Sequence, residues 1–99
     1  MEFKGTKGKW ITEKFDLEGY EKSILIVSKN DNKQIAEVNF EYLRNDDYFY
    51  NALLISKAPE MLEMLIKLKD AILELMEHQD GWEEDYEELE KLIKEATEL

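Results

Sequence analysis

Residues 51–67, NALLISKAPEMLEMLIK, decide how this chain folds, because they place the only proline of the sequence inside a strongly helical apolar run. Proline has no backbone N–H, and its ring crowds the preceding turn of a helix. It also disfavours the helical conformation for the residue before it, which is Ala58. We therefore expect a short helix to end near Lys57 and a new helix to begin with Pro59 at its first position.

The new helix is predicted to be long and amphipathic. Its main apolar stripe repeats at alternating steps of four and three residues, which is typical of a helix with one buried face. The stripe consists of Met61, Leu65, Leu68, Ile72 and Leu75, and it is widened by Leu62, Ile66, Leu73 and Met76. Met64 lies off the stripe and indicates a second apolar face.

A last helix is predicted for residues 82–99. Its apolar residues repeat the same spacing, as Trp82, Tyr86, Leu89, Ile93 and Ala96. Asp80 and Glu83 have the spacing of a capping box, in which Asp80 caps the helix and Glu83 reaches back. Because the gap between the two helices is short, we expect an antiparallel hairpin. The alternative is one long helix that passes through Gly81 and pairs with a second subunit.

The first half of the chain predicts three β-strands. Two are rich in aromatic or branched residues, Lys9–Phe15 and Ser23–Ser28, and the third, Gln34–Tyr42, alternates apolar and polar residues. Residues 16–21 contain a glycine and predict a turn, and the Asn- and Asp-rich residues 29–33 predict a hairpin loop. Short links between neighbouring strands favour an antiparallel meander.

The predicted fold class is α+β: a three-stranded antiparallel β-meander, a short helix, a long Pro59-initiated helix and an acidic C-terminal helix that completes a helical hairpin. With 99 residues, the chain is expected to form a single domain, residues 1–99. Its predicted parts are a mobile arm over 1–8, the meander over 9–43, a helical segment over 46–79 that is broken near Pro59, and the acidic amphipathic helix over 82–99.

The negative charge is concentrated at one end of the chain. The formal net charge is -11, and residues 70–99 carry twelve acidic side chains against only Lys91 and Lys94. A field of this sign repels nucleic acid and anionic membranes and attracts basic protein surfaces. We therefore expect a protein partner with a basic, nucleic-acid-binding surface, and neither direct nucleic-acid binding nor membrane association.

The composition also limits the chemistry and the compartment. The chain has no cysteine, which excludes disulfides and thiolate metal sites and suits the reducing cytoplasm. Its first ten residues lack the apolar core of a signal peptide, and no apolar run approaches the roughly 20 residues of a membrane span. A cytoplasmic location is expected.

No catalytic, cofactor-binding or metal site is predicted, and we do not expect an enzyme. His78 is the only histidine, and it is placed near a predicted helix end, where a partly charged imidazole is favourable. The serines Ser23, Ser28 and Ser56 have no neighbouring acid–histidine pair to activate them. The acidic cluster near residue 85 lacks the spacing of a calcium-binding loop.

Partner binding is the remaining class of function. The acidic cluster is either a solvated helix face or a row of carboxylates that mimics nucleic acid in a basic groove, and exposed aromatic side chains are candidate anchors. The candidate partner-binding residues are Glu83, Glu84, Asp85, Glu87, Glu88, Glu90, Tyr48, Tyr50 and Trp82.

Three pieces of the sequence resemble, in order, a group of small phage- or prophage-encoded proteins of mostly unknown function. Gly8-Lys9-Trp10 resembles their "GPW" opening, residues 35–38 resemble their "IAEV" strand, and residues 51–65 resemble their "NARLIAAAPELLEAL" signature. Ser56 and Lys57 depart from the alanines of that signature, and the acidic tail lies outside the resemblance. The resemblance implies a phage gene and brings no catalytic residues.

Three functions are compatible with these patterns. The leading hypothesis is a non-enzymatic phage inhibitor of a host nucleic-acid-directed defence system, such as an anti-CRISPR protein, acting in the infected bacterial cell. An alternative is a structural or regulatory adaptor that forms a homodimer through its C-terminal helices. A second alternative is a sponge for a cyclic nucleotide immune signal, although a chain with Arg44 as its only arginine offers little to bind such an anion.

Overall fold

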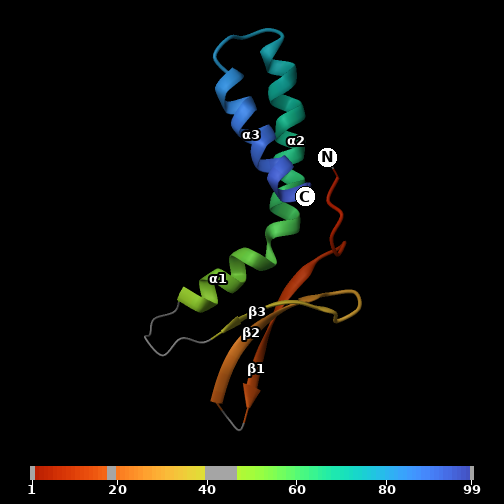
Figure 1. Ribbon diagram of the computed structural model, residues 1–99, viewed down its shortest axis with the longest axis vertical. Helices are drawn as coiled ribbons and strands as arrows, with labels where there is room; N and C mark the ends of the chain where they lie inside the picture. Colours follow the sequence, from red (N-terminus) through yellow and green to blue (C-terminus); the bar gives the residue numbers. More distant parts are fainter. Residues whose placement is uncertain (1, 18–19, 40–46, 99) are drawn as a thin grey trace. The chain divides into compact units, whose positions relative to one another are not determined.

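The computed structural model describes residues 2–17, 20–39 and 47–98 (Figure 1). It confirms the predicted α+β class, with a three-stranded antiparallel sheet followed by three helices. The elements are β1 (Trp10–Leu17), β2 (Tyr20–Ser28), β3 (Gln34–Asn39), α1 (Asp47–Ser56), α2 (Ala58–Met76) and α3 (Glu83–Thr97). They group into two compact units, Thr6–Pro59 and Met1–Gly5 with Glu60–Leu99, which we call the sheet unit and the hairpin unit.

The sheet has the strand order β1-β2-β3, with β2 in the centre and both neighbours antiparallel to it. Ile26 of β2 lies opposite Thr12 of β1 and Ala36 of β3. The β1–β2 ladder is longer than expected, because Asp16 and Glu21, which were predicted to lie in a turn, are paired across it. The strand predicted to reach Tyr42 is described as far as Asn39, and the rest of it lies in residues 40–46, outside the described part of the chain.

The loop between β2 and β3 is a tight turn, as its Asn- and Asp-rich sequence predicts. Asn32 adopts a φ of 55°, a left-handed conformation that asparagine tolerates better than most residues. The backbone N–H of Lys33 donates to Oδ1 of Asp31 at 3.3 Å. Hydrogen bonds from the Ser28 hydroxyl and the Lys33 backbone hold the pKa of the Asp31 carboxyl below its ordinary value.

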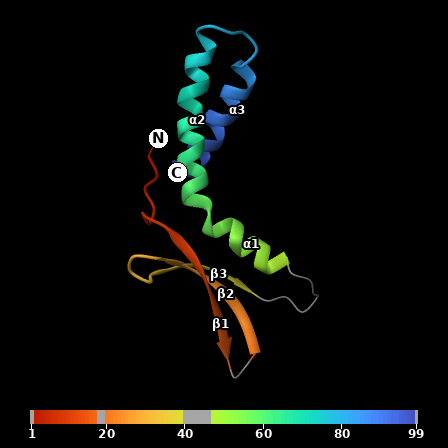
Figure 2. The same ribbon diagram turned by 180° about the vertical axis from the view of Figure 1, so that it is seen from behind.

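Helix α1 packs on one face of the sheet and closes the core of this unit (Figure 2). The centre of the core is formed by Ile24, Ile26 and Ala52, which are almost completely buried. The partly buried residues around them are Trp10, Ile35, Ala36, Val38, Tyr48, Phe49 and Ile55. Ile24 and Ile26 are therefore buried because they lie on the face of the central strand that α1 covers.

The helical segment breaks at Lys57, one residue before the predicted position. Helix α1 ends at Ser56, and α2 begins at Ala58, so that Pro59 is its second residue. The Lys57 N–H donates to the Leu54 carbonyl at 3.1 Å, which tightens the last turn of α1. Backbone N–H groups in the first turn of a helix have no partner within the helix, so a proline there removes no helical hydrogen bond.

Helices α2 and α3 run antiparallel and form the predicted hairpin (Figures 1 and 2). Helix α2 ends at Met76, and Gly81 adopts a φ of +101° between the helices, so the alternative of one continuous helix is wrong. The expected capping box is also wrong. The N-cap is Trp82, without a side-chain cap, and the Glu83 carboxylate accepts from the Gly81 N–H at 3.2 Å.

The hairpin has its own small core. Its buried residues are Ile72, Leu89 and Ile93, and the residues packed around them are Leu62, Leu65, Ile66, Met76, Trp82 and Tyr86. The predicted face of α2 was only partly correct, since Met61 and Leu68 are each 48% exposed. The apolar arc of α2 is wider than one neighbouring helix can cover, and α3 covers the side that contains Leu65 and Ile72.

The buried face of α3 differs from the predicted one at the C-terminal end of the helix. Thr97 is buried and Ala96 is exposed, although Ala96 was predicted to continue the apolar stripe. The Thr97 hydroxyl donates to the Ile93 carbonyl at 2.8 Å. A hydroxyl satisfied within its own helix can be buried at low cost, so threonine serves as the last residue of the seam.

Candidate functional site

The outer face of α3 carries a row of carboxylates. Five of the six predicted acidic residues are exposed there, namely Glu83, Glu84, Asp85, Glu87 and Glu88. Three of them occupy the first turn of the helix, where the positive end of the helix dipole stabilises negative charge. Opposite this face, Leu89 and Ile93 are buried against α2, which fixes the orientation of the helix within the hairpin. We call these five residues the acidic face.

Some members of the acidic face repel one another. Glu83 and Glu87, as well as Glu84 and Glu88, are four residues apart and therefore neighbours on the helix surface. Like charges at this spacing destabilise a helix by about 0.2–0.5 kcal/mol per pair. A cationic surface placed against the acidic face would relieve this repulsion.

Glu90, the sixth predicted acidic residue, has a different environment. Its Oε2 lies 3.9 Å from Nζ of Lys69 on α2, and its Oε1 lies 3.8 Å from Nζ of Lys94 on α3. Its side chain is only 35% exposed. Glu90 therefore connects the two helices of the hairpin and lies between two lysines.

The phenol of Tyr86 lies beside Glu90 on the same helix. Partial desolvation raises the pKa of Tyr86 above its ordinary value, and the charges of Glu90 and Asp70, together with a hydrogen bond to Glu90, raise it further. Tyr86 packs against the hairpin core. It thus stays neutral at physiological pH and belongs to the supporting structure of the acidic face.

The three predicted aromatic anchors lie in different settings. Trp82 is half-buried against the hairpin core, and its Nε1 donates to Oε1 of Gln79 at 3.4 Å. Tyr48 packs against the core of the sheet unit, whereas Tyr50 is 63% exposed on α1. Trp82 is the one anchor that adjoins the acidic face directly, because it is the N-cap of α3.

The groups considered for catalysis are not brought together. His78 is exposed just beyond the end of α2, and the hydroxyl of Ser23 donates to Oε2 of Glu37 at 2.6 Å. The Ser56 hydroxyl donates to the Leu53 carbonyl at 2.7 Å. Within residues 2–17, 20–39 and 47–98, no cluster of three or more metal-ligating side chains occurs.

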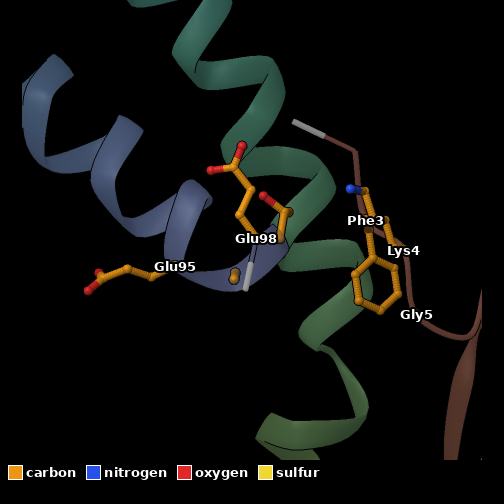
Figure 3. Close-up of a pocket in the computed structure, with 7 residues that line it drawn as sticks. Phe3, Lys4, Gly5, Glu95 and Glu98 are labelled. Carbon is orange, nitrogen blue, oxygen red and sulfur yellow. The ribbon is translucent and has the colours of Figure 1, made fainter.

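A hollow of about 400 Å³ lies in the hairpin unit between the N-terminal arm and the end of α3 (Figure 3). It is lined by Phe3, Lys4, Gly5, Glu95, Ala96, Thr97 and Glu98. The ring of Phe3 fills the space next to Gly5, and the Glu95 side chain extends away from the arm. The lining lacks the convergent polar groups that orient a small ligand.

A second exposed surface lies on α2, where Met64 had indicated a second apolar face. Helix α2 presents large apolar side chains to solvent, including Met64 at 64% exposure and Leu68 at 48%. The off-stripe position of Met64 was the one signal of this surface in the sequence. Residues on both sides of α2 are apolar, so spacing alone does not decide which side packs against α3.

Comparison with protein families matches residues 1–98 to the family described as Salmonella phage P22 protein Y8K6. The chain belongs to this phage protein family. The match supports the phage origin that the sequence resemblance implied. Neither the curated proteins nor the solved structures contain a match to this chain. Among the helices that the structure describes, none is both long enough and apolar enough to cross a lipid bilayer.

Proposed function

We propose that this member of the phage family is a non-enzymatic inhibitor of a host nucleic-acid-directed defence system, of the anti-CRISPR or a similar anti-defence type. It would act in the cytoplasm of the infected bacterial cell. The observation that carries the proposal is the acidic face of α3, a row of five exposed carboxylates on a helix whose opposite side is fixed by a buried core.

The mechanism is electrostatic competition. Enzymes that act on DNA or RNA hold the phosphate backbone in grooves lined by lysine and arginine. Carboxylates that repeat along a helix offer such a groove an alternative set of negative charges, and the helix is pre-organised, so little conformational entropy is lost on binding. Occupation of the groove by the acidic face would exclude the nucleic acid.

Aromatic contacts would add affinity that charge alone does not supply. Binding energy is usually concentrated in a few buried anchors, with tyrosine and tryptophan prominent among them. Trp82 adjoins the acidic face, and its half-buried ring retains surface for a partner. Tyr50, which is 63% exposed on α1, is the candidate anchor of the sheet unit.

The same arrangement is the support for proposing a non-enzymatic protein. The charged groups gathered on α3 are all exposed or ion-paired carboxylates and lysines, and catalytic acids and bases are usually partly buried and matched to one another. A surface of this kind suits recognition of a charged partner.

The test uses a panel of purified guide-RNA nucleases and restriction enzymes from bacterial hosts, and measures the rate of DNA cleavage with and without the protein. The acidic-face variant changes Glu83, Glu84, Glu87 and Glu88 to lysine. The proposal predicts inhibition of at least one enzyme by the wild type and loss of that inhibition in the variant, because the reversed charges repel a basic groove.

A matched control separates the acidic face from net charge. Four exposed acids on α2 or directly after it are changed to lysine in the control, which alters the net charge by the same amount: Glu63, Asp70, Glu74 and Glu77. The control should retain most of the inhibition, and circular dichroism should show both variants folded. Undiminished inhibition by a folded acidic-face variant, or no inhibition of any enzyme by the wild type, would overturn the proposal.

A further inference from the structure

An exposed apolar stripe runs along α2 on the side that α3 leaves uncovered. Its members follow steps of three and four residues, which places them in one line along the helix. They are Met61, Met64, Leu68, Ala71 and Leu75, with exposures of 48%, 64%, 48% and 38% for the four large side chains. We call this set the outer stripe, and it remains exposed with residues 2–5 of the arm in place.

The spacing of the outer stripe is that of a coiled-coil seam. In a heptad repeat, Met61, Leu68 and Leu75 occupy the a positions, and Met64 and Ala71 occupy the d positions. A seam of this length, exposed on a folded unit, is uncommon, since monomeric proteins rarely leave large contiguous apolar patches in water. The regular spacing suits another helix as the covering element.

The hairpin unit is also small for a stable monomer. Its buried hydrophobic residues are Ile72, Leu89 and Ile93, and Glu60–Leu99 spans 40 residues. Units of about this size usually need disulfides, metals or oligomerisation to supply the missing core. The chain has no cysteine, and the described residues contain no candidate metal cluster. Self-association would enlarge this core, and a hairpin doubled across the outer stripe would be a four-helix bundle.

We infer that the outer stripe pairs with the outer stripe of a second copy of this chain, with the two α2 helices antiparallel. In this arrangement a positions face d positions, so that Leu68 lies opposite the small Ala71 of the other copy and Met64 lies opposite Leu75. Each leucine of the seam therefore meets either a small residue or a flexible methionine, which favours close packing.

Charge complementarity supports the antiparallel direction. Lys67 and Glu74 flank the seam at g positions, both are exposed, and neither forms an ion pair within the part of the chain that the structure describes. Antiparallel helices bring g positions together, so Lys67 of each copy approaches Glu74 of the other. In a parallel pair the g positions face e positions, which are Leu65 and Ile72, and both of these are already used in the hairpin core.

The pairing of two copies is independent of the proposed inhibition. The two interactions are expected to depend on salt concentration in opposite directions. Docking of the acidic face on a basic groove weakens as salt rises, because screening reduces the attraction. Pairing of two chains that each carry a net charge of -11 becomes stronger with salt, since screening reduces their mutual repulsion.

Sedimentation equilibrium of the full-length chain over a range of concentrations and salt tests the pairing. The wild type should approach twice the mass of one chain. Leu68→Glu should raise the dissociation constant by about thirtyfold or more, as expected for a buried anchor. Leu73→Glu is the matched control: Leu73 lies on the same helix, is 47% exposed and points away from the outer stripe, so dimerisation should persist.

Exchange of the charges at Lys67 and Glu74 tests whether the two α2 helices are antiparallel. Glu74→Lys should weaken the dimer even though it lowers the net negative charge, and the double variant Lys67→Glu/Glu74→Lys should restore the wild-type dissociation constant to within about threefold. A wild-type chain that stays monomeric at high concentration and high salt would overturn the inference, as would equal effects of Leu68→Glu and Leu73→Glu. A dimer strengthened by Glu74→Lys would overturn the antiparallel arrangement.

Discussion

The Nζ atom of Lys69 on α2 lies 3.9 Å from Oε2 of Glu90 on α3, and this ion pair links the two helices of the hairpin. Lys94 approaches the other carboxylate oxygen of Glu90 at 3.8 Å. Glu90 thus differs from the five exposed carboxylates of the acidic face, although all six belong to one acidic run in the sequence. Its carboxylate lies between two lysines, whereas the other five side chains are exposed.

Glu90→Gln should lower the free energy of unfolding of the hairpin by about 0.5 kcal/mol, the usual contribution of a partly exposed ion pair. Glu87→Gln is the control, because Glu87 is exposed and lies four residues from Glu83, so its neutralisation removes a like-charge repulsion and should not destabilise. Chemical denaturation followed by circular dichroism measures both. A larger loss for Glu87→Gln than for Glu90→Gln would contradict this assignment.

Two adjacent residues of α3 test the hairpin core. Ile93 is completely buried, and Ile93→Ala should cost about 3 kcal/mol through lost apolar contacts and the cavity that remains. Leu92 is 52% exposed, and Leu92→Ala should change stability by less than about 0.5 kcal/mol. Denaturant unfolding of the two variants compares them directly. Similar losses at both positions would mean that α3 packs on a different face.

Gly81 tests the loop that reverses the chain. Its φ of +101° is unfavourable for any residue with a side chain, although a Cβ there would meet no neighbouring atom. Gly81→Ala should therefore destabilise the hairpin by about 1–2 kcal/mol through backbone strain alone. If α2 and α3 formed one continuous helix instead, the same change would stabilise it, because alanine favours helix over glycine. The sign of the change in unfolding free energy distinguishes the two structures.

The sequence was sufficient to predict the order of the elements and the break before Pro59. It was not sufficient to choose the buried side of α2. Leu68 and Leu65 belong to one wide apolar arc, and periodicity gives them similar weight, whereas the position of α3 buries one side only. The prediction of the N-cap of α3 was wrong because the course of the loop could not be predicted from spacing. Asp80 has the right spacing, but the backbone turns at Gly81 and places Trp82 at the N-cap.

The acidic face was predicted as a row of six residues, and five of them are exposed together on α3. The position of Glu90 could not be predicted from its own helix, because one of its two lysine partners, Lys69, lies on α2. Likewise, the sequence marks Trp82 and Tyr50 as aromatic, but their burial depends on the helices and strands that pack beside them.

Tyr86 predicts a specific alkaline dependence of stability. Because folding raises the pKa of this phenol, the neutral phenol contributes to the free energy of unfolding. This contribution is fully present below the pKa of an unfolded tyrosine, about 10. It is lost as the pH rises from there through the folded-state pKa. Tyr86→Phe should remove this part of the alkaline loss. Tyr50→Phe, at an exposed position of α1, should retain it. Denaturant midpoints at pH values above and below 10 measure the difference, and identical pH profiles for the two variants would contradict the assignment of this alkaline loss to Tyr86.

The proposed function requires the acidic face of α3 to compete with nucleic acid for a basic groove of a host enzyme. The most direct test is the rate at which an inhibited guide-RNA nuclease or restriction enzyme cleaves DNA in the presence of the protein. Reversal of Glu83, Glu84, Glu87 and Glu88 to lysine should restore cleavage to the uninhibited rate, while the control with four acids reversed on or directly after α2 should still inhibit. Equal inhibition by the wild type and the folded acidic-face variant would contradict the claim.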